Sequence, residues 1–271
     1  MKNKLKTASL WVFALIIVIG TSIYQRLTGP TYPKREKIEI GGNSYKFKLL
    51  RSHGGNENCK FSIFVGKNTS GKLHYRLYPT KNEFTIVEMV KNGDSLQLEL
   101  PHQAPAGKLE YFLEFSDNGK SIFVNKEDTI IIRFKGDVPQ WVLIPHIFMM
   151  FFSLFFITLS ALYAITNKPN YKLYAFIALV LFTLGGLVFG PIVQKFAFGE
   201  YWTGIPWGWD LTDNKTLFGF IAWVVAVMLN LKKERRWAMV VGALFVLIIF
   251  SIPHSMHGSE RNPETGKIIS A

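Results

Sequence analysis

Five long apolar segments constrain this 271-residue chain more than any other feature of its sequence. They cover residues 8–24, 138–165, 173–194, 217–231 and 237–253. No Asp, Glu, Lys or Arg interrupts any of them. A membrane-spanning helix needs about 20 residues that are mostly apolar, and shorter spans borrow from their flanks. The sequence therefore predicts a membrane α-helical bundle of five spans.

The positive charges predict how this bundle is oriented. The N-terminal tip, the loop after the second segment and the loop after the fourth together carry nine Lys or Arg residues and one Glu. Loops rich in Lys and Arg stay on the cytoplasmic side. We therefore expect a bacterial inner-membrane protein with a cytoplasmic N-terminus, and with its large domain and C-terminal tail outside. The net charge of +12 then mostly records topology and does not favour a nucleic-acid partner.

These boundaries divide the chain into four parts. The expected parts are a membrane span over 1–25, an extracytoplasmic β-domain over 26–137, a four-helix membrane domain over 138–257 with a Trp-rich outer loop at 195–216, and an extracytoplasmic tail over 258–271. Basic residues followed by an apolar run also fit a cleaved signal peptide. No small-x-small cleavage site precedes Gln25, so the sequence favours an uncleaved signal anchor.

Residues 37–135 alternate between apolar and polar positions and are divided by turn residues. The expected strands are 45–50, 59–65, 73–77, 84–90, 95–100, 108–115, 121–124 and 129–134. Asn-Gly-Asp at 92–94 and Asp-Asn-Gly at 117–119 supply residues that tolerate the positive φ of hairpin turns. About 100 residues in seven to nine strands predict an immunoglobulin-like β-sandwich.

Histidines near the outer ends of two segments are candidate ligands. His146 lies about seven residues inside the second segment, where an ionisable side chain is costly and marks a functional site. The alternative is that its imidazole hydrogen-bonds a neighbouring helix. His254, Met256 and His257 follow the fifth segment, and imidazole and thioether ligands suit copper or haem iron. An interfacial turn is the alternative interpretation of that group.

The loop at 195–216 contains Trp202, Trp207 and Trp209, separated by glycine and proline. Tryptophan favours membrane interfaces, and rigid aromatic loops also make flat platforms for planar ligands. We expect at least one of Asp210, Thr212 and Asp213 to cap the following helix, because a side-chain oxygen accepts hydrogen bonds from free N–H groups at a helix start.

The segment Trp207-Gly-Trp209-Asp210, followed by a span that contains Trp223, resembles the Trp-rich WWD segment of membrane haem-handling proteins in cytochrome c maturation. The resemblance implies that His146 is the upstream axial ligand, that His254 or His257 is the downstream one, and that the three loop tryptophans form a platform. It covers about 30 residues. The fuller Trp-Gly-x-x-Trp-x-Trp-Asp pattern is absent, and the β-domain has no counterpart in that family.

Two classes of function follow. The first is a cofactor protein that binds haem b or copper at its outer face, for electron transfer or cytochrome and respiratory-complex assembly. The second is a non-enzymatic adaptor or assembly subunit whose β-domain docks an extracytoplasmic protein partner. A weaker third interpretation is an enzyme in which Asp210 or Asp213 acts with His257 as an acid–base pair.

Overall fold

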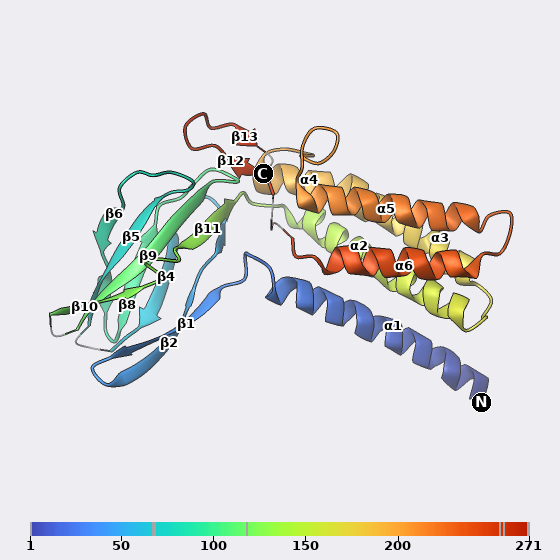
Figure 1. Cartoon of the computed structure of the whole chain (residues 1–271), viewed down its shortest axis with the longest axis horizontal. Helices are drawn as coiled ribbons and strands as arrows, with labels where there is room; N and C mark the ends of the chain where they lie inside the picture. The colour runs from blue at the N-terminus through green and yellow to red at the C-terminus, as the bar shows by residue number, and fades with distance from the viewer. Residues whose placement is uncertain (1, 67–68, 118, 255, 257, 270–271) are drawn as a thin grey trace.

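The chain combines a bundle of apolar helices with a β-domain (Figure 1). The computed structural model describes residues 2–66, 69–117, 119–254, 256 and 258–269. The helices are α1 (Lys2–Leu27), α2 (Gln140–Ile165), α3 (Tyr171–Phe182), α4 (Gly190–Phe198), α5 (Leu211–Leu229) and α6 (Arg236–Ser251), with the π-helical η1 (Thr183–Phe189) between α3 and α4. Each predicted apolar segment coincides with a helix.

Four of these helices are long and apolar enough to cross a membrane. They are Thr7–Leu27 within α1, α2, the continuous segment Tyr171–Phe198, and α5. The fifth, α6, is apolar but shorter. The helices therefore favour membrane association, and a fifth span stays a prediction.

The third segment changes its helical period where Gly185 and Gly186 lie. This π-helical stretch packs closely on α2, because a Cβ added at Gly185 would lie 2.8 Å from the Cβ of Met149. A π-bulge shifts the hydrogen-bonding pattern by one residue and is frequent at functional sites. The absence of a Cβ at Gly185 therefore permits this close helix packing.

The fourth helix begins earlier than the hydropathy pattern predicts. Asp210 caps α5 by accepting hydrogen bonds from the backbone N–H groups of Thr212 (2.8 Å) and Asp213 (3.4 Å). The helix therefore starts at Leu211 and includes Asp213 and Lys215 ahead of the uncharged segment 217–231, which extends into its N-terminal flank as its shortness requires. The predicted cap is confirmed, and a cap rather than hydropathy decides where the helix starts.

The β-domain contains two main sheets that share a hydrophobic core. Its strands are β1 (Lys34–Ile40), β2 (Asn43–Leu49), β3 (Ser52–Gly54), β4 (Cys59–Phe64), β5 (Ser70–Leu77), β6 (Thr85–Glu88), β7 (Val90–Asn92), β8 (Ser95–Leu100), β9 (Lys108–Asp117), β10 (Lys120–Val124) and β11 (Ile130–Lys135). One sheet has the order β3-β11-β9-β5-β6, with β10 also paired to β9, and the other has the order β4-β8-β7. The hairpin β1–β2 contributes to the same core.

The alternation of apolar residues located the core strands but not the first and third strands. The single strand predicted at 84–90 is wrong, because this segment forms two strands, β6 and β7, that belong to different sheets. In β1 only Ile38 and Ile40 are buried hydrophobic residues, and its other positions are charged, so the pattern is weak. The hairpin predicted at 92–94 is confirmed: β7 pairs with β8, and Gly93 has φ +59°. In the second predicted turn Gly119 has φ +80°, and residue 118 lies outside the described part of the chain.

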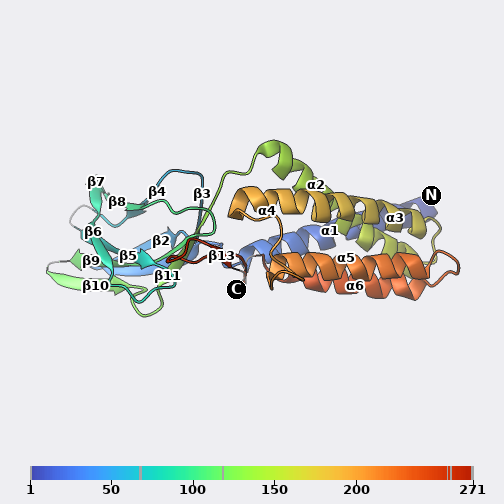
Figure 2. The same ribbon diagram turned by 90° about the horizontal axis from the view of Figure 1, so that it is seen from above.

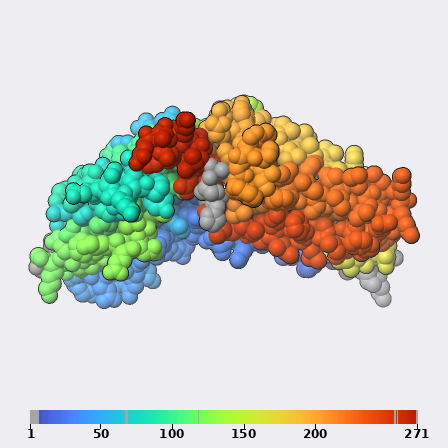
Figure 3. Space-filling view, turned by 45° about the horizontal axis from the view of Figure 1, so that its top comes forward, coloured from blue at the N-terminus to red at the C-terminus, as the bar shows by residue number. Residues whose placement is uncertain are grey.

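The β-domain lies at one end of the bundle, and two further views show how the parts meet (Figures 2 and 3). The C-terminal strands β12 (Glu260–Arg261) and β13 (Ile268–Ile269) lie beside the β-domain at this junction. We call this the junction end of the bundle. The N-terminus of α1, the loop between α2 and α3 and the loop between α5 and α6 lie at the opposite end, which we call the basic end.

Candidate functional site

Direct backbone contacts fix the β-domain to the junction end. The backbone N–H of Gly136, just after β11, donates to the carbonyl oxygen of Ala197 in α4 (3.0 Å). A Cβ at Gly136 would collide with the backbone oxygen of Phe196, so glycine permits this close approach. The tail adds a second attachment, because the N–H of Arg261 donates to the carbonyl oxygen of Ala106 (3.1 Å).

The Trp-rich loop is held by the first turn of α5. A single oxygen of Asp213, Oδ2, accepts from the backbone N–H of Thr203 (2.6 Å) and of Gly204 (3.0 Å). The same oxygen accepts from the amide of Gln194 in α4 (3.0 Å). Asp213 is buried, so these bonds satisfy donors that would otherwise lack water. The helix start therefore sets the shape of the loop.

Asp210 joins the cap of α5 to the tail. Its second oxygen, Oδ2, accepts from the backbone N–H of Ser259 (2.8 Å) and from the Ser259 hydroxyl (3.0 Å). On the other side of Ser259, buried Arg133 of β11 donates to its carbonyl oxygen and lies 3.9 Å from the ring centre of Phe198. Burial lowers the pKa of Arg133 to about 10, and the charge of Asp210 opposes this shift. Tail, sheet and helix thus share one buried polar cluster.

The three loop tryptophans are placed differently. Trp202 is half-buried, and its indole N–H donates to the carbonyl oxygen of Ile205 (3.1 Å) within the loop. Trp207 and Trp209 are 79% and 72% exposed. Two large exposed indoles on a rigid loop suit either a membrane interface or a ligand that lies against them.

His146 is oriented by the π-helical segment. Its Nδ1 lies 2.9 Å from the carbonyl oxygen of Gly185. A carbonyl only accepts, so Nδ1 carries the proton and Nε2 of the neutral ring holds a lone pair. The predicted bond to a neighbouring helix is therefore present, and it leaves the tautomer in which histidines bind metals through Nε2.

His254 is held by a buried lysine. Lys215 is 1% exposed, and its Nζ donates to the carbonyl oxygen of Ile252 (2.7 Å) and lies 2.5 Å from Nδ1 of His254. When Lys215 is charged, its ammonium only donates, so Nδ1 of His254 is the acceptor and the proton lies on Nε2. In this arrangement Nε2 of His254 is a hydrogen-bond donor rather than a metal ligand.

The two histidines lie within electrostatic range of each other. Burial lowers the pKa of His254, and electrostatic interactions with Lys215, His146 and Lys135 lower it further. His254 is nevertheless an exposed residue. Met256 is also exposed.

His257 lies outside the described residues. Among the residues that are described, no group of three His, Cys, Asp or Glu side chains is arranged to hold a metal ion.

Sequence reasoning missed Lys215, Arg133 and Ser259. Lys215 lies two residues before the fourth apolar segment, and the cap at Asp210 places it on the helix. Arg133 and Ser259 are far apart in sequence, and only the folded chain brings them together. The cap was the one available signal.

The chain was compared with known proteins. It matches no protein-family model, and a search of curated proteins finds no significant match.

Proposed function

We propose that the chain is an integral membrane protein that binds haem b or copper at the junction end of its bundle. Its role would be electron transfer or the assembly of cytochromes and respiratory complexes. In the proposed orientation this end faces outward from a bacterial inner membrane, the N-terminus is cytoplasmic, and the β-domain is an extracytoplasmic immunoglobulin-like sandwich. The nine basic residues near the N-terminus and at the basic end support this orientation.

One observation carries the proposal: the hydrogen bond from Nδ1 of His146 to Gly185. It fixes the ring and leaves Nε2 as a lone-pair donor within an apolar bundle. Metal-binding histidines donate their other N–H to a carbonyl or carboxylate in the same way. The bond partner lies in a π-helical segment, a feature common at functional sites.

His254 is less suited than His146 to bind haem iron or copper. With Lys215 as its donor, His254 would bind a metal through Nε2 only after losing the proton there. His146 is therefore the expected first ligand, and His254, His257 or Met256 would supply the second. The bound group would supply the redox chemistry, and the protein would hold it and shield it from water.

Spectroscopy of the detergent-purified full chain tests this proposal. We expect a Soret band that shifts on reduction, with about one iron per chain, or instead stoichiometric copper by elemental analysis. His146→Ala removes the signal. His53→Ala is the matched control, because His53 lies in β3 of the β-domain.

Two results would reject the proposal. One is wild-type protein that takes up neither haem nor copper when either is supplied in excess. The other is His146→Ala protein that remains folded and binds as much of the group as wild type does.

A second function, that of an adaptor, is favoured by the free edges of the β-domain. β6 pairs only with β5, and β7 only with β8, within the described part of the chain. Ile86 in β6 and Val90 in β7 are 58% and 65% exposed on these edges. An exposed sheet edge with apolar side chains can take a strand from another protein.

Two sets of variants separate the functions. Alanine at His146, His254 and His257 abolishes a cofactor function and leaves an adaptor intact. Lysine at Ile86 and Val90 abolishes an adaptor function and leaves a cofactor function intact, because charges on an edge block strand pairing. The cellular phenotype of each set shows which function the chain performs.

A further inference from the structure

The basic end of the bundle carries cations that the protein does not neutralise. Glu234 is the acidic residue in the loop between α5 and α6, and Arg236 already engages it through Nε (3.4 Å) and Nη2 (3.3 Å). Lys232, Lys233 and Arg235 of the same loop are exposed. Within the described residues, none of these three side chains forms an ion pair. Their charge is therefore available to something outside the chain.

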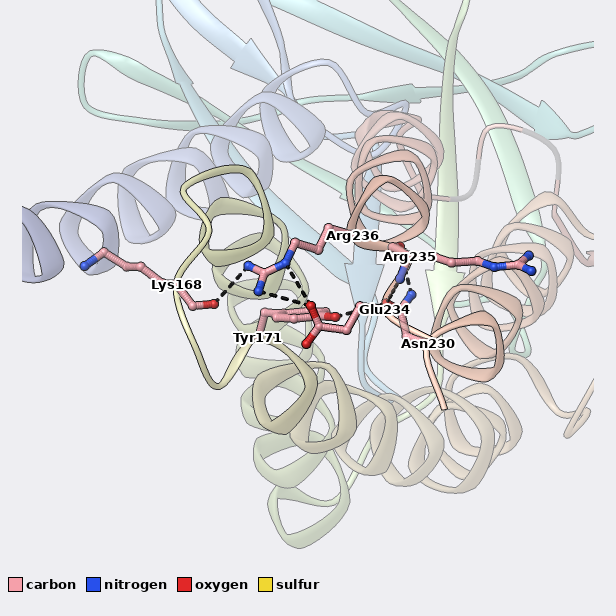
Figure 4. Close-up of polar contacts among 6 residues, drawn as sticks. All are labelled: Lys168, Tyr171, Asn230, Glu234, Arg235 and Arg236. Atoms are coloured by element: carbon pink, nitrogen blue, oxygen red, sulfur yellow. Dashed lines mark hydrogen bonds and ion pairs between the residues drawn. The ribbon is translucent and has the colours of Figure 1, made fainter. Parts of the chain in front are cut away.

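The loop that presents these cations is rigid. Buried Asn230 accepts from the backbone N–H of Arg235 (2.8 Å) and donates to its carbonyl oxygen (3.0 Å). The hydroxyl of Tyr171 in α3 donates to the same Asn230 oxygen (3.2 Å), and Arg236 lies over the Tyr171 ring at 4.8 Å. Figure 4 shows these contacts, with the Arg235 side chain pointing away from them. A fixed backbone lowers the entropy lost when a ligand binds.

The cations border a surface depression of about 500 Å³. It is lined by Lys233, Glu234, Arg235, Arg236 and Trp237. With Glu234 and Arg236 paired to each other, the groups left to meet a ligand are Lys233, Arg235 and the indole of Trp237, which is 60% exposed. Two cations beside an interfacial aromatic ring form a site for an anionic group at membrane depth.

An apolar stripe on α6 runs from this depression along the helix. Trp237, Val241, Leu244 and Ile248 recur at helical spacing and are 60%, 56%, 55% and 68% exposed. A small soluble anion has no apolar part that could contact this stripe, whereas an acyl chain would cover it. The headgroup site and the stripe together fit one molecule with an anionic head and a hydrocarbon tail.

We propose that this depression binds the phosphodiester headgroup of an anionic phospholipid whose acyl chain lies along α6. Arg235 offers paired N–H donors to two phosphate oxygens, Lys233 offers a point charge, and Trp237 contacts the glycerol region. The site lies at the end of the bundle opposite His146 and is independent of cofactor binding.

Binding of fluorescent phosphatidylglycerol and phosphatidylcholine to the detergent-solubilised full chain tests the proposal. Wild-type protein should prefer phosphatidylglycerol. Each cation that donates a charge-assisted hydrogen bond to the headgroup contributes roughly a fivefold preference for anionic lipid. The double variant Lys233→Gln/Arg235→Gln should therefore lose about 25-fold of that preference.

The matched control removes the same charge from the same end of the bundle. Lys172→Gln/Lys232→Gln changes two exposed lysines that do not line the depression. We expect this control to change the preference by less than about twofold, because general attraction in detergent is weak and screened.

Three outcomes would overturn the proposal. The first is equal binding of the two lipids by wild-type protein. The second is a loss in the control as large as in the double variant, which would indicate general electrostatic attraction. The third is complete displacement of the lipid by millimolar inorganic phosphate or glycerol phosphate, which would indicate a site for free anions.

Discussion

The two ends of the helical bundle use charge in opposite ways. At the junction end, Asp210, Asp213, Lys215 and Arg133 are all at most 5% exposed and hydrogen-bonded to other parts of the chain. At the basic end, Lys172, Lys232, Lys233 and Arg235 are exposed, and Glu234 is paired with Arg236. At the junction end the charged groups form hydrogen bonds within the protein. At the basic end they are exposed on its surface.

This difference separates charges that hold the fold from charges that meet a partner. A buried ionised group is tolerated only when it is well paired and hydrogen-bonded, so removing one member leaves the others unsatisfied. An exposed cation costs little to keep and little to remove. Substitutions at the junction end should therefore change stability, and those at the basic end should change binding.

The largest expected effect is at Asp213. Asp213→Ala removes the acceptor of two backbone N–H groups and of the Gln194 amide. We expect the free energy of unfolding to fall by about 3 kcal/mol, because unsatisfied buried donors cost roughly 1–3 kcal/mol each. Thermal unfolding in detergent measures the change. Asp213→Asn keeps one oxygen and should lose less, and an equal loss in both variants would contradict the argument.

The second effect tests the contact between sheet and bundle. Gly136→Ala places a methyl group against the backbone oxygen of Phe196, so β11 and α4 must separate. Overpacking of this kind costs about 1–3 kcal/mol. We expect a lower unfolding temperature and faster proteolysis between the two parts.

Gly54→Ala is the control for this steric effect, because nothing lies within 4 Å of a Cβ at Gly54. Equal stability losses at Gly136 and Gly54 would show that the junction is not a tight contact.

The third effect distinguishes two arginines at the basic end, Arg236 and Arg235. Arg236 contacts Glu234, the carbonyl oxygen of Lys168 and the Tyr171 ring. Arg236→Gln should therefore cost about 1 kcal/mol, the sum of a cation–π contact and a partly exposed ion pair. Arg235→Gln should change unfolding by less than about 0.5 kcal/mol in lipid-free detergent. Unfolding of both variants by denaturant tests this contrast, which disappears if Arg235 also holds the fold.

The sequence predicts the contrast between the ends only in part. Hydropathy located the five apolar segments, each of which is helical in the described chain, and turn residues with alternating strands located most of the β-domain. The cap at Asp210 was expected because a carboxylate precedes an apolar run. The contact between Lys215 and His254 was not predictable, since it joins residues 39 apart through the folding of two helices.

The tautomer of His146 was equally hidden in the sequence. It depends on which carbonyl oxygen faces Nδ1, and the π-helical segment decides that. Hydropathy and motif spacing report which residues are buried and in what order, but not which polar atoms meet.

The smallest effect comes from an ion pair that belongs to neither end. On the β-domain, Glu114 accepts from the hydroxyl of Ser121 (2.7 Å) and lies 2.9 Å from Nε2 of His74. The Ser121 bond, and then the His74 bond, lower the pKa of Glu114. A carboxyl whose pKa is lower in the folded than in the unfolded state stabilises the fold above its unfolded pKa of about 4.5. That stabilisation is lost as the pH falls through the lower, folded value.

With Ser121→Ala, the free energy of unfolding should therefore fall less steeply as the pH is lowered below about 4.5. The change is a few tenths of a kcal/mol, because the pair is partly exposed. Denaturant unfolding at pH 5.5 and at about pH 3.5 measures it, within the window that linkage sets.

Ser62→Ala, on an exposed position of β4, is the control and should leave the pH dependence unchanged. If Ser121→Ala also leaves it unchanged, the Ser121 bond does not set the acidity of Glu114. A clear effect would show that exposed pairs contribute measurably but far less than the cluster around Asp213.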